Sequence, residues 1–369
     1  MKNAAITGWG AAMPPAVLTN DDLSTFMDTN DEWIVSRTGM KERRVSHVNA
    51  TELAAVSAKR ALACAGLEAA DLDLIVYGSC SYEEQVPNAS SGVQAMIGAH
   101  KAAAMDVNTA CTSFLYGLSS AAAMIKTGVV RNALVVGVEH ISPFMDWDNR
   151  NVAVLFGDGC ASAVLQATDG PEGLLGEQLG CLANARHTLR VRGMGTGYAN
   201  YGITVGQTYW NFEGTEIFRH AVQGMAEASA KVLAKCGYTA ADVDIVVPHQ
   251  ANLRIIAAVA KAAGIPMEKV MLTVERYGNM SAATVPVALT EALEQGRIRP
   301  GALILMPAFG AGLTVCAHLV RWGQRVTPLG VSDAALPPNP RTALEIINDI
   351  RARKASTRES SVEGIMAAK

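Results

Sequence analysis

The chain has 369 residues, of which 50% are hydrophobic and 18% are charged, and its formal net charge is −3. This composition excludes wholesale disorder, and the balanced charge gives no support for non-specific binding to nucleic acid. The seven cysteines are scattered and form no C-x-x-C pair, which argues against structural zinc and favours a reducing compartment, the cytoplasm.

The first elements in chain order are a short apolar run and then one copy of an internal repeat. Residues 1–8 carry one lysine and too few apolar residues for the core of a signal peptide. Residues 62–76 and 233–247 share eight of fifteen positions at an offset of 171. Each copy has the pattern of a helix, a glycine cap, an Ala-Ala-Asp turn and an apolar strand. The repeat therefore predicts a duplicated α/β domain.

Cys111 is the candidate nucleophile. It follows a predicted strand at 103–107 and precedes a predicted helix that begins at Thr112. The positive end of a helix macrodipole lowers the pKa of a thiol at that place, which would give Cys111 thiolate character. The alternative, commoner for this residue type, is a buried structural cysteine.

His249 and Asn279 are candidates for the same site as Cys111. His249 follows a predicted strand at 245–247, and the offset of the repeat matches Asn279 to Asn108, which lies beside Cys111. Because ligands collect at the carboxyl ends of strands in open α/β sheets, we expect the three side chains to meet between the halves. A thiol, an imidazole and an amide together suit nucleophilic catalysis. Singly, the last two could be a satisfied histidine and an ordinary turn asparagine.

Residues 301–320 contain no Asp, Glu, Lys or Arg, which is long enough for a membrane helix. Pro307 and several glycines divide the segment, so we predict two buried strands and no membrane span. The turn between them, Phe309–Thr314, has the sequence FGAGLT. Its small residues would let backbone N–H groups approach a ligand and form an oxyanion hole, although a tight strand connection has the same pattern.

The C-terminal residues 324–369 have a different character, with several prolines and mixed charges. Leu344, Ile347 and Ile350 predict an amphipathic helix over 342–354, which we expect to pack on a neighbouring molecule. The chain is thus predicted to contain three parts. They are an N-terminal half (1–170) with the cysteine, a C-terminal half (171–323) with the histidine and asparagine, and an extension (324–369) of unknown role.

Six strings of residues, in chain order, resemble β-ketoacyl-acyl-carrier-protein synthase III over about residues 3–322. They are DEWI with RTG within 31–39, DVNTACTSF around Cys111, FGDG from Phe156, PHQANLRII from Pro248, RYGNMSAATVP from Arg276 and FGAGLT from Phe309. The resemblance implies a thiolase-like fold, a duplicated αβαβα five-layer sandwich that forms a homodimer. By sequence pattern alone, the FGDG string is a structural turn that enters a buried strand.

The resemblance also implies a reaction. Cys111 would take an acyl group from acyl-CoA, with the N–H groups of Cys111 and Ala311 holding the oxyanion. Malonyl-acyl carrier protein would then lose CO₂, and His249 and Asn279 would donate hydrogen bonds to the resulting enolate. Attack of the enolate on the acyl-cysteine would give a 3-oxoacyl-acyl carrier protein, which initiates fatty-acid or related synthesis. This chemistry needs no metal and no cofactor.

Further residues match positions that bind the substrates in that family. Trp33 and Arg150 would stack on the adenine of CoA, a role suited to an indole and a guanidinium. Arg37 and Asn252 would also contact CoA. The carrier protein would bind a basic face formed by Arg219, Arg254 and Lys261, although such residues are usually a solvated helix face.

The chain departs from the family pattern at several places. Val86 stands where the family often has a phenylalanine that plugs the acyl pocket of the partner subunit, so we expect it to admit medium or longer acyl chains. Residues 181–210 match the family poorly, and the extension beyond Gly323 has no expected counterpart.

Two other functions remain open at the level of sequence. An acyltransferase could pass the acyl group from Cys111 to an alcohol or an amine without decarboxylation, and it would have less need of Asn279. A non-catalytic partner subunit of a ketosynthase would tend to lose the nucleophile. Because all three residues are present, condensation is the favoured function.

Overall fold

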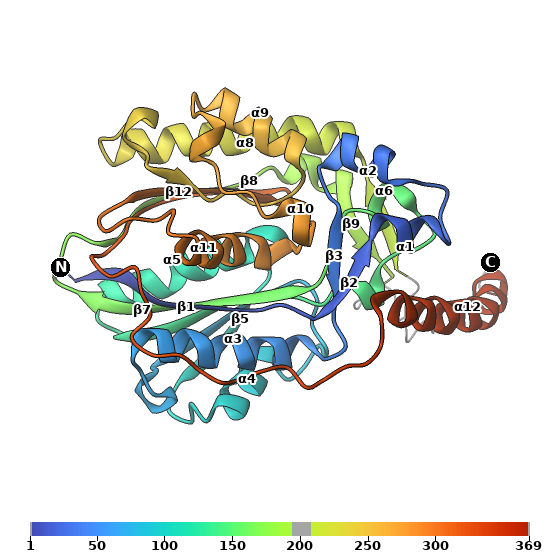
Figure 1. The fold of residues 1–369 in the computed structure, drawn as a ribbon, viewed down its shortest axis with the longest axis horizontal. Coiled ribbons are helices and arrows are strands. Elements are labelled where there is room, and N and C mark those ends of the chain that lie inside the picture. The colour runs from blue at the N-terminus through green and yellow to red at the C-terminus, as the bar shows by residue number, and fades with distance from the viewer. Residues whose placement is uncertain (1, 194–207, 368–369) are drawn as a thin grey trace.

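The computed structural model describes residues 2–193 and 208–367. Two sheets alternate with three layers of helices (Figure 1). In spatial order, the first sheet contains β1 (Asn3–Ala12), β7 (Gly159–Thr168), β6 (Asn132–Glu139), β4 (Leu74–Gly78) and β5 (Ala103–Val107). The second contains β11 (Ile245–Val246), β12 (Leu303–Gly310), β13 (Thr314–Arg321) and β8 (Gly173–Cys181).

The helices form an outer layer on each side and one layer between the sheets. In Figure 1 the lower layer contains α3 (Ala50–Ala65) and α4 (Ala89–Ile97), the middle layer α5 (Ser113–Lys126) and α11 (Thr284–Glu294), and the upper layer α8 (Gly214–Lys235) and α9 (Leu253–Ala262). The middle layer is buried on both sides, because Phe114 and Leu118 of α5 share one apolar cluster with Val76 of β4 and Met306 of β12. This is the predicted five-layer α/β sandwich.

The remaining elements lie mainly beside the layers. They are β2 (Ala16–Thr19), α1 (Asn20–Ser24), α2 (Asp31–Thr38), β3 (Glu42–Val45), α6 (Arg150–Ala153), β9 (Leu189–Arg192), β10 (Tyr209–Phe212), α10 (Val274–Tyr277) and α12 (Ala343–Ala367). Short 3₁₀ turns are η1 (Ala69–Asp71), η2 (Ala110–Thr112), η3 (Ser142–Phe144), η4 (Ala183–Thr188), η5 (Ala240–Asp242), η6 (Met267–Lys269) and η7 (Ser281–Ala283).

The two sheets repeat the same topology. β7 pairs antiparallel with β1 and β6, and β4 pairs parallel with β6. In the second sheet, β13 pairs antiparallel with β8 and β12, and β11 pairs parallel with β12. The offset of 171 holds in detail, since Gly66 and Gly237 both cap helices with positive φ, of 69° and 76°. Ala110 and Ser281, again 171 apart, are the non-glycine residues with positive φ in the described chain, at 52° and 44°.

A glycine on β6 allows the two halves to approach each other. A Cβ at Gly137 would stand 2.5 Å from the carbonyl oxygen of Ala282 in η7, a distance that no real side chain tolerates. η7 can therefore lie directly against the carboxyl end of the first sheet. This contact brings the turn after Asn279 next to the turn that carries Cys111.

The apolar segment 301–320 forms β12 and β13 as predicted. Within the described residues, no helix is long and apolar enough to cross a membrane. All seven cysteines are free thiols.

The extension folds back along its own chain, and its packing on a neighbouring molecule stays a prediction. Arg325 donates a 3.0 Å hydrogen bond to the carbonyl of Cys64 at the end of α3, and Arg60 donates to the carbonyl of Ala334. The predicted helix is present as α12, which contacts β2 and β3. The buried face of α12 contains Ala343, Ile346 and Ile347. Packing these side chains against the same chain removes their apolar surface from water.

Candidate active site

Cys111 lies in η2, directly before α5, and only 9% of it is exposed. Burial raises the pKa of the Cys111 thiol to about 12, against a hydrogen bond from Ser281 that lowers it. This direction is opposite to the thiolate character expected at a helix terminus, because desolvation penalises the charged form of the thiol. At neutral pH Cys111 is a thiol, and its attack on a substrate requires a base.

His249 follows β11 and is buried, and its backbone N–H donates to the carbonyl of Pro307. Its Nδ1 lies 2.6 Å from the hydroxyl of Thr284, which donates its own proton to the carbonyl of Ser281 at 2.9 Å. Because the hydroxyl has one proton, Nδ1 must donate to it, and the lone pair is then on Nε2. Burial lowers the pKa of His249 to about 3, so the imidazole is neutral and can accept a proton.

The side chain of Asn279 is oriented by its own turn. Its Oδ1 accepts a 2.8 Å hydrogen bond from the backbone N–H of Ser281, and its backbone pairs with Leu155 and Gly157. Since the oxygen is engaged, the Nδ2 amide remains to donate to a bound molecule. Asn279 is buried, which makes such a donor effective in a low dielectric.

η7 connects the three predicted catalytic residues. Ser281 contacts Cys111 and Asn279, and Thr284 joins the Ser281 carbonyl to His249. Sequence analysis missed Ser281 and Thr284 as parts of the site. The signal was available, because the offset of 171 matches Ser281 to Ala110, the residue before the candidate nucleophile.

Glu139, a buried carboxyl group at the end of β6, holds η7 in place through hydrogen bonds. It accepts hydrogen bonds from the hydroxyl of Ser81 at 2.5 Å and from the backbone N–H groups of Cys80 and Ala282 at 3.1 and 3.3 Å. Burial raises the pKa of Glu139, and these donors oppose that shift. Sequence analysis did not single out Glu139, because a single glutamate at a strand end carries no motif.

The Gly-rich turn between β12 and β13 lies against Cys111. A Cβ at Gly310 would stand 2.9 Å from the backbone nitrogen of Cys111, so only glycine lets the turn come this close. The hydroxyl of Thr314 donates to the carbonyl of Thr109 at 3.0 Å and fixes the turn in place. Gly310, which precedes Ala311, is therefore next to the Cys111 backbone. The oxyanion hole formed with the Ala311 N–H stays a prediction. Asp158 of the FGDG string instead accepts four hydrogen bonds from Ser46, Ile141 and Ser142, a structural role.

Trp33, Arg37 and Arg150, predicted to bind CoA, lie together at the surface. The guanidinium carbons of Arg37 and Arg150 are 4.5 and 5.1 Å from the centroid of a Trp33 ring. Trp33 and Arg37 line a pocket of about 570 Å³, with Asn252 at its edge. The Asn252 side-chain oxygen caps α9 by accepting from Ile255 N–H, which leaves its amide group for a ligand.

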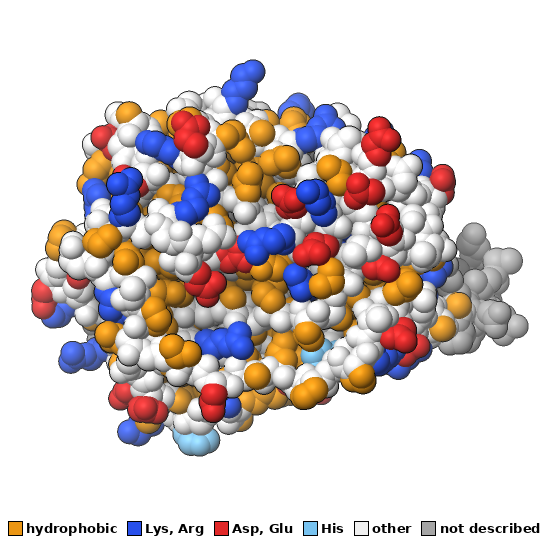
Figure 2. All heavy atoms as spheres, in the orientation of Figure 1, with side chains coloured by type: hydrophobic (Ala, Val, Ile, Leu, Met, Phe, Trp, Pro, Cys, Tyr) orange, Lys and Arg blue, Asp and Glu red, His pale blue; other side chains and the backbone are white. Residues whose placement is uncertain are grey.

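The predicted carrier-protein residues lie on two neighbouring helices, Arg219 on α8 and Arg254 and Lys261 on α9. Arg254 also lines the pocket beside Trp33. Arg219 is paired with Glu216, so its charge is partly compensated. On the face seen in Figure 2, basic and acidic side chains are interspersed. Val86, the predicted gate of the acyl pocket, is 80% exposed in the single chain and does not belong to its hydrophobic core.

The raised pKa of Cys111 gives a testable pH profile. We expect alkylation of Cys111 by iodoacetamide to speed up about tenfold per pH unit between pH 7 and 10, because only the small thiolate fraction reacts. Mass spectrometry of the tryptic peptide would measure the rate, with the exposed Cys181 as an internal reference. A rate that is already constant above pH 7 would show a stable thiolate and contradict the burial argument.

Two segments of the chain match family models. Residues 105–182, which include Cys111, match the model described as 3-oxoacyl-acyl-carrier-protein synthase III. Residues 233–322, which include His249 and Asn279, match the model of the C-terminal part of the same protein.

Whole relatives match over most of the chain. β-Ketoacyl-acyl-carrier-protein synthase III 2 from Vibrio cholerae is 50% identical over 345 residues, 94% of this chain and 95% of the relative. The synthase III of Roseiflexus castenholzii is 44% identical over 325 residues, 86% of this chain and 98% of the relative. The crystal structure of 3-oxoacyl-acyl-carrier-protein synthase III from Aquifex aeolicus is 39% identical, with a TM-score of 0.82, and covers 86% of this chain and 100% of that chain.

The match to the Vibrio cholerae protein corrects one expectation. An alignment that covers 94% of the chain cannot end at Gly323, so part of the extension has a counterpart in that relative. The extension was expected to have none, because the resemblance rested on motifs that all lie before residue 323.

Proposed function

The chain belongs to the 3-oxoacyl-acyl-carrier-protein synthase III family, and on that premise we propose that it joins an acyl group from acyl-CoA to malonyl-acyl carrier protein by decarboxylative Claisen condensation. The products are a 3-oxoacyl-acyl carrier protein, CoA and CO₂. The supporting observation is that Cys111, His249 and Asn279 meet around η7. Ser281 contacts the Cys111 thiol and donates its N–H to Asn279, and Thr284 accepts from Nδ1 of His249. The reaction starts fatty-acid or related synthesis in the cytoplasm.

In the first step Cys111 becomes acylated. Nε2 of neutral His249 takes the thiol proton as the sulfur attacks the thioester carbon of acyl-CoA. The backbone N–H groups of Cys111 and Ala311 hold the oxyanion of the tetrahedral intermediate. The carbon–sulfur bond to CoA then breaks, and the CoA thiolate takes the proton back from His249 and leaves as a thiol.

In the second step malonyl-acyl carrier protein loses CO₂. The electron pair of the broken carbon–carbon bond forms a thioester enolate, which needs donors at its oxygen. Asn279 supplies its Nδ2 amide. His249 must present an Nε2 proton. It loses its Nδ1 proton to solvent and takes up one proton at Nε2, and the Thr284 hydroxyl turns from the Ser281 carbonyl to donate to Nδ1. The enolate carbon attacks the acyl-cysteine, and the released thiolate takes up one proton. Protein groups serve every step, without a cofactor.

Trp33, Arg37, Arg150 and Asn252 would bind the CoA portion, and Arg219, Arg254 and Lys261 the carrier protein. The placement of Trp33, Arg37 and Asn252 in one pocket wall, with the Arg150 guanidinium over the Trp33 ring, supports the CoA assignment. The placement of Arg254 in the same pocket wall supports a shared entrance for both substrates. We further propose that the halves divide near residue 170, between β7 and β8, and that the extension begins near residue 324.

The enzyme would act as a homodimer. Among the described residues, β5 lies at one edge of the first sheet and pairs only with β4, and such an edge can continue the sheet into a second copy. The strongly exposed Val86 supports the same association, since its apolar side chain would be covered by the partner.

We expect Val86→Phe to restrict the enzyme to short primers, because the larger ring would occupy space that the acyl chain uses. The ratio of decanoyl-CoA to acetyl-CoA turnover should fall more than tenfold, and Val331→Phe, at another exposed position, should not change it. Competition assays with mixed acyl-CoAs would measure the ratio. An unchanged ratio in Val86→Phe would remove Val86 from the acyl pocket.

The competing function is an acyltransferase that delivers the acyl group to an alcohol or amine. The two are separated by incubating the enzyme with acyl-CoA and carboxyl-labelled malonyl-acyl carrier protein. Condensation releases one labelled CO₂ for each CoA. Loading of Cys111 alone releases one CoA per enzyme. Repeated release of CoA without CO₂, and only on addition of an alcohol or amine, would favour the acyltransferase. A non-catalytic subunit would release neither.

A further inference from the structure

The extension packs beside the loops that carry Trp33 and Arg150, the two residues proposed to stack on the adenine of CoA and called here the CoA clamp. Through Ile346 and Ile347, α12 belongs to an apolar cluster that also contains Met145 and Trp147. In Figure 1, α12 lies beside β2, and it contacts both β2 and β3. The first turns of α12 are therefore fixed on the same side of the molecule as Arg150.

Arg351 on α12 holds one of these loops. Its guanidinium carbon is 4.3 Å from the centroid of the Phe26 ring, and its Nε is buried with no hydrogen-bond acceptor among the described residues. The face of the Phe26 ring attracts the guanidinium, which also donates a 3.4 Å hydrogen bond to Oδ1 of Asn348. Phe26 also packs edge-on against Trp147, with centroids 6.4 Å apart.

The held loop leads directly to the clamp. Asp28, two residues after Phe26, accepts hydrogen bonds from Nη1 of Arg150 through its carbonyl and its carboxylate, the latter at 3.1 Å. Arg150 in turn lies over the ring of Trp33. A continuous set of contacts therefore runs from α12 to the side chains that would grip an adenine.

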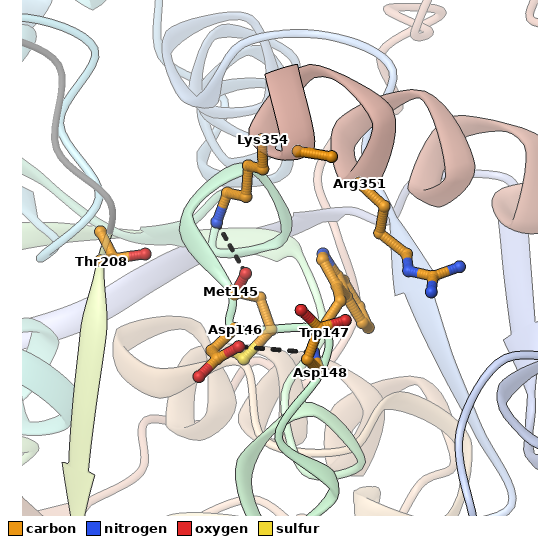
Figure 3. Close-up of a pocket in the computed structure, with 8 residues that line it drawn as sticks. Met145, Asp146, Trp147, Asp148, Thr208, Arg351 and Lys354 are labelled. Atoms are coloured by element: carbon orange, nitrogen blue, oxygen red, sulfur yellow. Dashed lines mark hydrogen bonds between the residues drawn. The ribbon is translucent and has the colours of Figure 1, made fainter. Parts of the chain in front are cut away.

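Lys354 holds the other segment that meets at Arg150. Its Nζ donates a 2.7 Å hydrogen bond to the carbonyl of Met145, which begins the loop that ends where α6 starts with Arg150 (Figure 3). A cavity of about 140 Å³ lies between α12, this loop and Thr208. The loop thus touches α12 at defined points and has space to shift between them.

We propose that α12 is a positioning element of the acyl-CoA site and that Arg351 and Lys354 set the place of the Arg150 clamp; this rests on the proposed function. An adenine between Trp33 and a guanidinium needs about 7 Å, two contacts of roughly 3.5 Å each. Arg150 is 5.1 Å from the ring centroid in the unliganded protein, so it must move outward while it stays anchored to Asp28. The two α12 contacts keep that anchor in position.

The test is the double variant Arg351→Met/Lys354→Met, which keeps the apolar stems of both side chains. We expect KM for acyl-CoA to rise about tenfold, the scale of losing a cation–π contact, with kcat and KM for malonyl-acyl carrier protein unchanged. Loading from acyl-N-acetylcysteamine, which lacks the nucleotide, should also be unchanged. Arg353→Met, on the exposed side of the same helix, is the matched control.

Calorimetric titration with CoA alone measures the affinity of the CoA site without acyl transfer. The double variant should bind CoA about tenfold more weakly. Unchanged KM and unchanged CoA affinity would overturn the inference. Equal losses with acyl-CoA and with the short donor would also overturn it, since they indicate a general structural defect. Failure of the wild type to load from acyl-CoA, with normal CoA binding, would instead contradict the proposed function.

Discussion

Asn279→Ala should lower the rate of condensation by about 10³-fold and leave acylation of Cys111 by acyl-CoA within about twofold of the wild type. The variant removes one preorganised donor to the enolate, a loss typically of 10²–10³ in rate. It leaves the thiol, the base and the backbone N–H groups of the first step in place. Rapid-quench measurement of acyl loading, followed by CO₂ release, separates the two half-reactions.

Asn279→Asp is the sharper comparison. The side chain keeps its size and can still accept from Ser281 N–H, but it presents an oxygen where the amide donated. We expect it to be at least as impaired as Asn279→Ala in decarboxylation. Equal losses in loading and condensation for both variants would show that Asn279 only supports the structure, and would favour the acyltransferase.

His249→Ala should impair both half-reactions, by about 10²–10⁴-fold each, because one residue is base in the first step and donor in the second. In the wild type the acylation rate should stay flat from pH 8 down to pH 5. The pKa of His249 is lowered to about 3 by burial, so the neutral imidazole that acts as base persists far below the usual histidine range. An inflection near pH 6.5 would contradict this.

His318 offers a matched control. It is equally buried on β13, burial lowers its pKa likewise to about 3, and its Nε2 is paired with Ser119 of α5. His318→Gln should retain both half-reactions within a few-fold, with folding checked by circular dichroism. Loss of activity in both histidine variants would point to a shared structural effect rather than to catalysis by His249.

Much of the fold was predictable, because short local patterns in the sequence indicate the duplication. The Ala-Ala-Asp turns and the glycine caps at Gly66 and Gly237 fix equivalent helix–strand units. The apolar runs before and after the FGAGLT turn fix two buried strands. Strand ends then follow from topology, and so does the meeting of Cys111 with the turn after Asn279.

What the sequence could not predict depends on packing across long separations. The pKa of Cys111 depends on how completely η7 and the Gly-rich turn cover it, and local sequence showed only a helix terminus. The roles of Thr284 and Glu139 appear only when their partners are in place. The docking of α12 was missed because its apolar face matches β2 and β3, whose exposed surface no local pattern reveals.

The most direct test is the intact mass of the enzyme after mixing with acyl-CoAs from acetyl to decanoyl, then with malonyl-acyl carrier protein, beside Cys111→Ala. We expect one acyl adduct on the wild type and none on the variant. The adduct should disappear on addition of malonyl-acyl carrier protein as 3-oxoacyl-acyl carrier protein and CO₂ form. An adduct on Cys111→Ala, or one that malonyl-acyl carrier protein cannot discharge, would contradict the account.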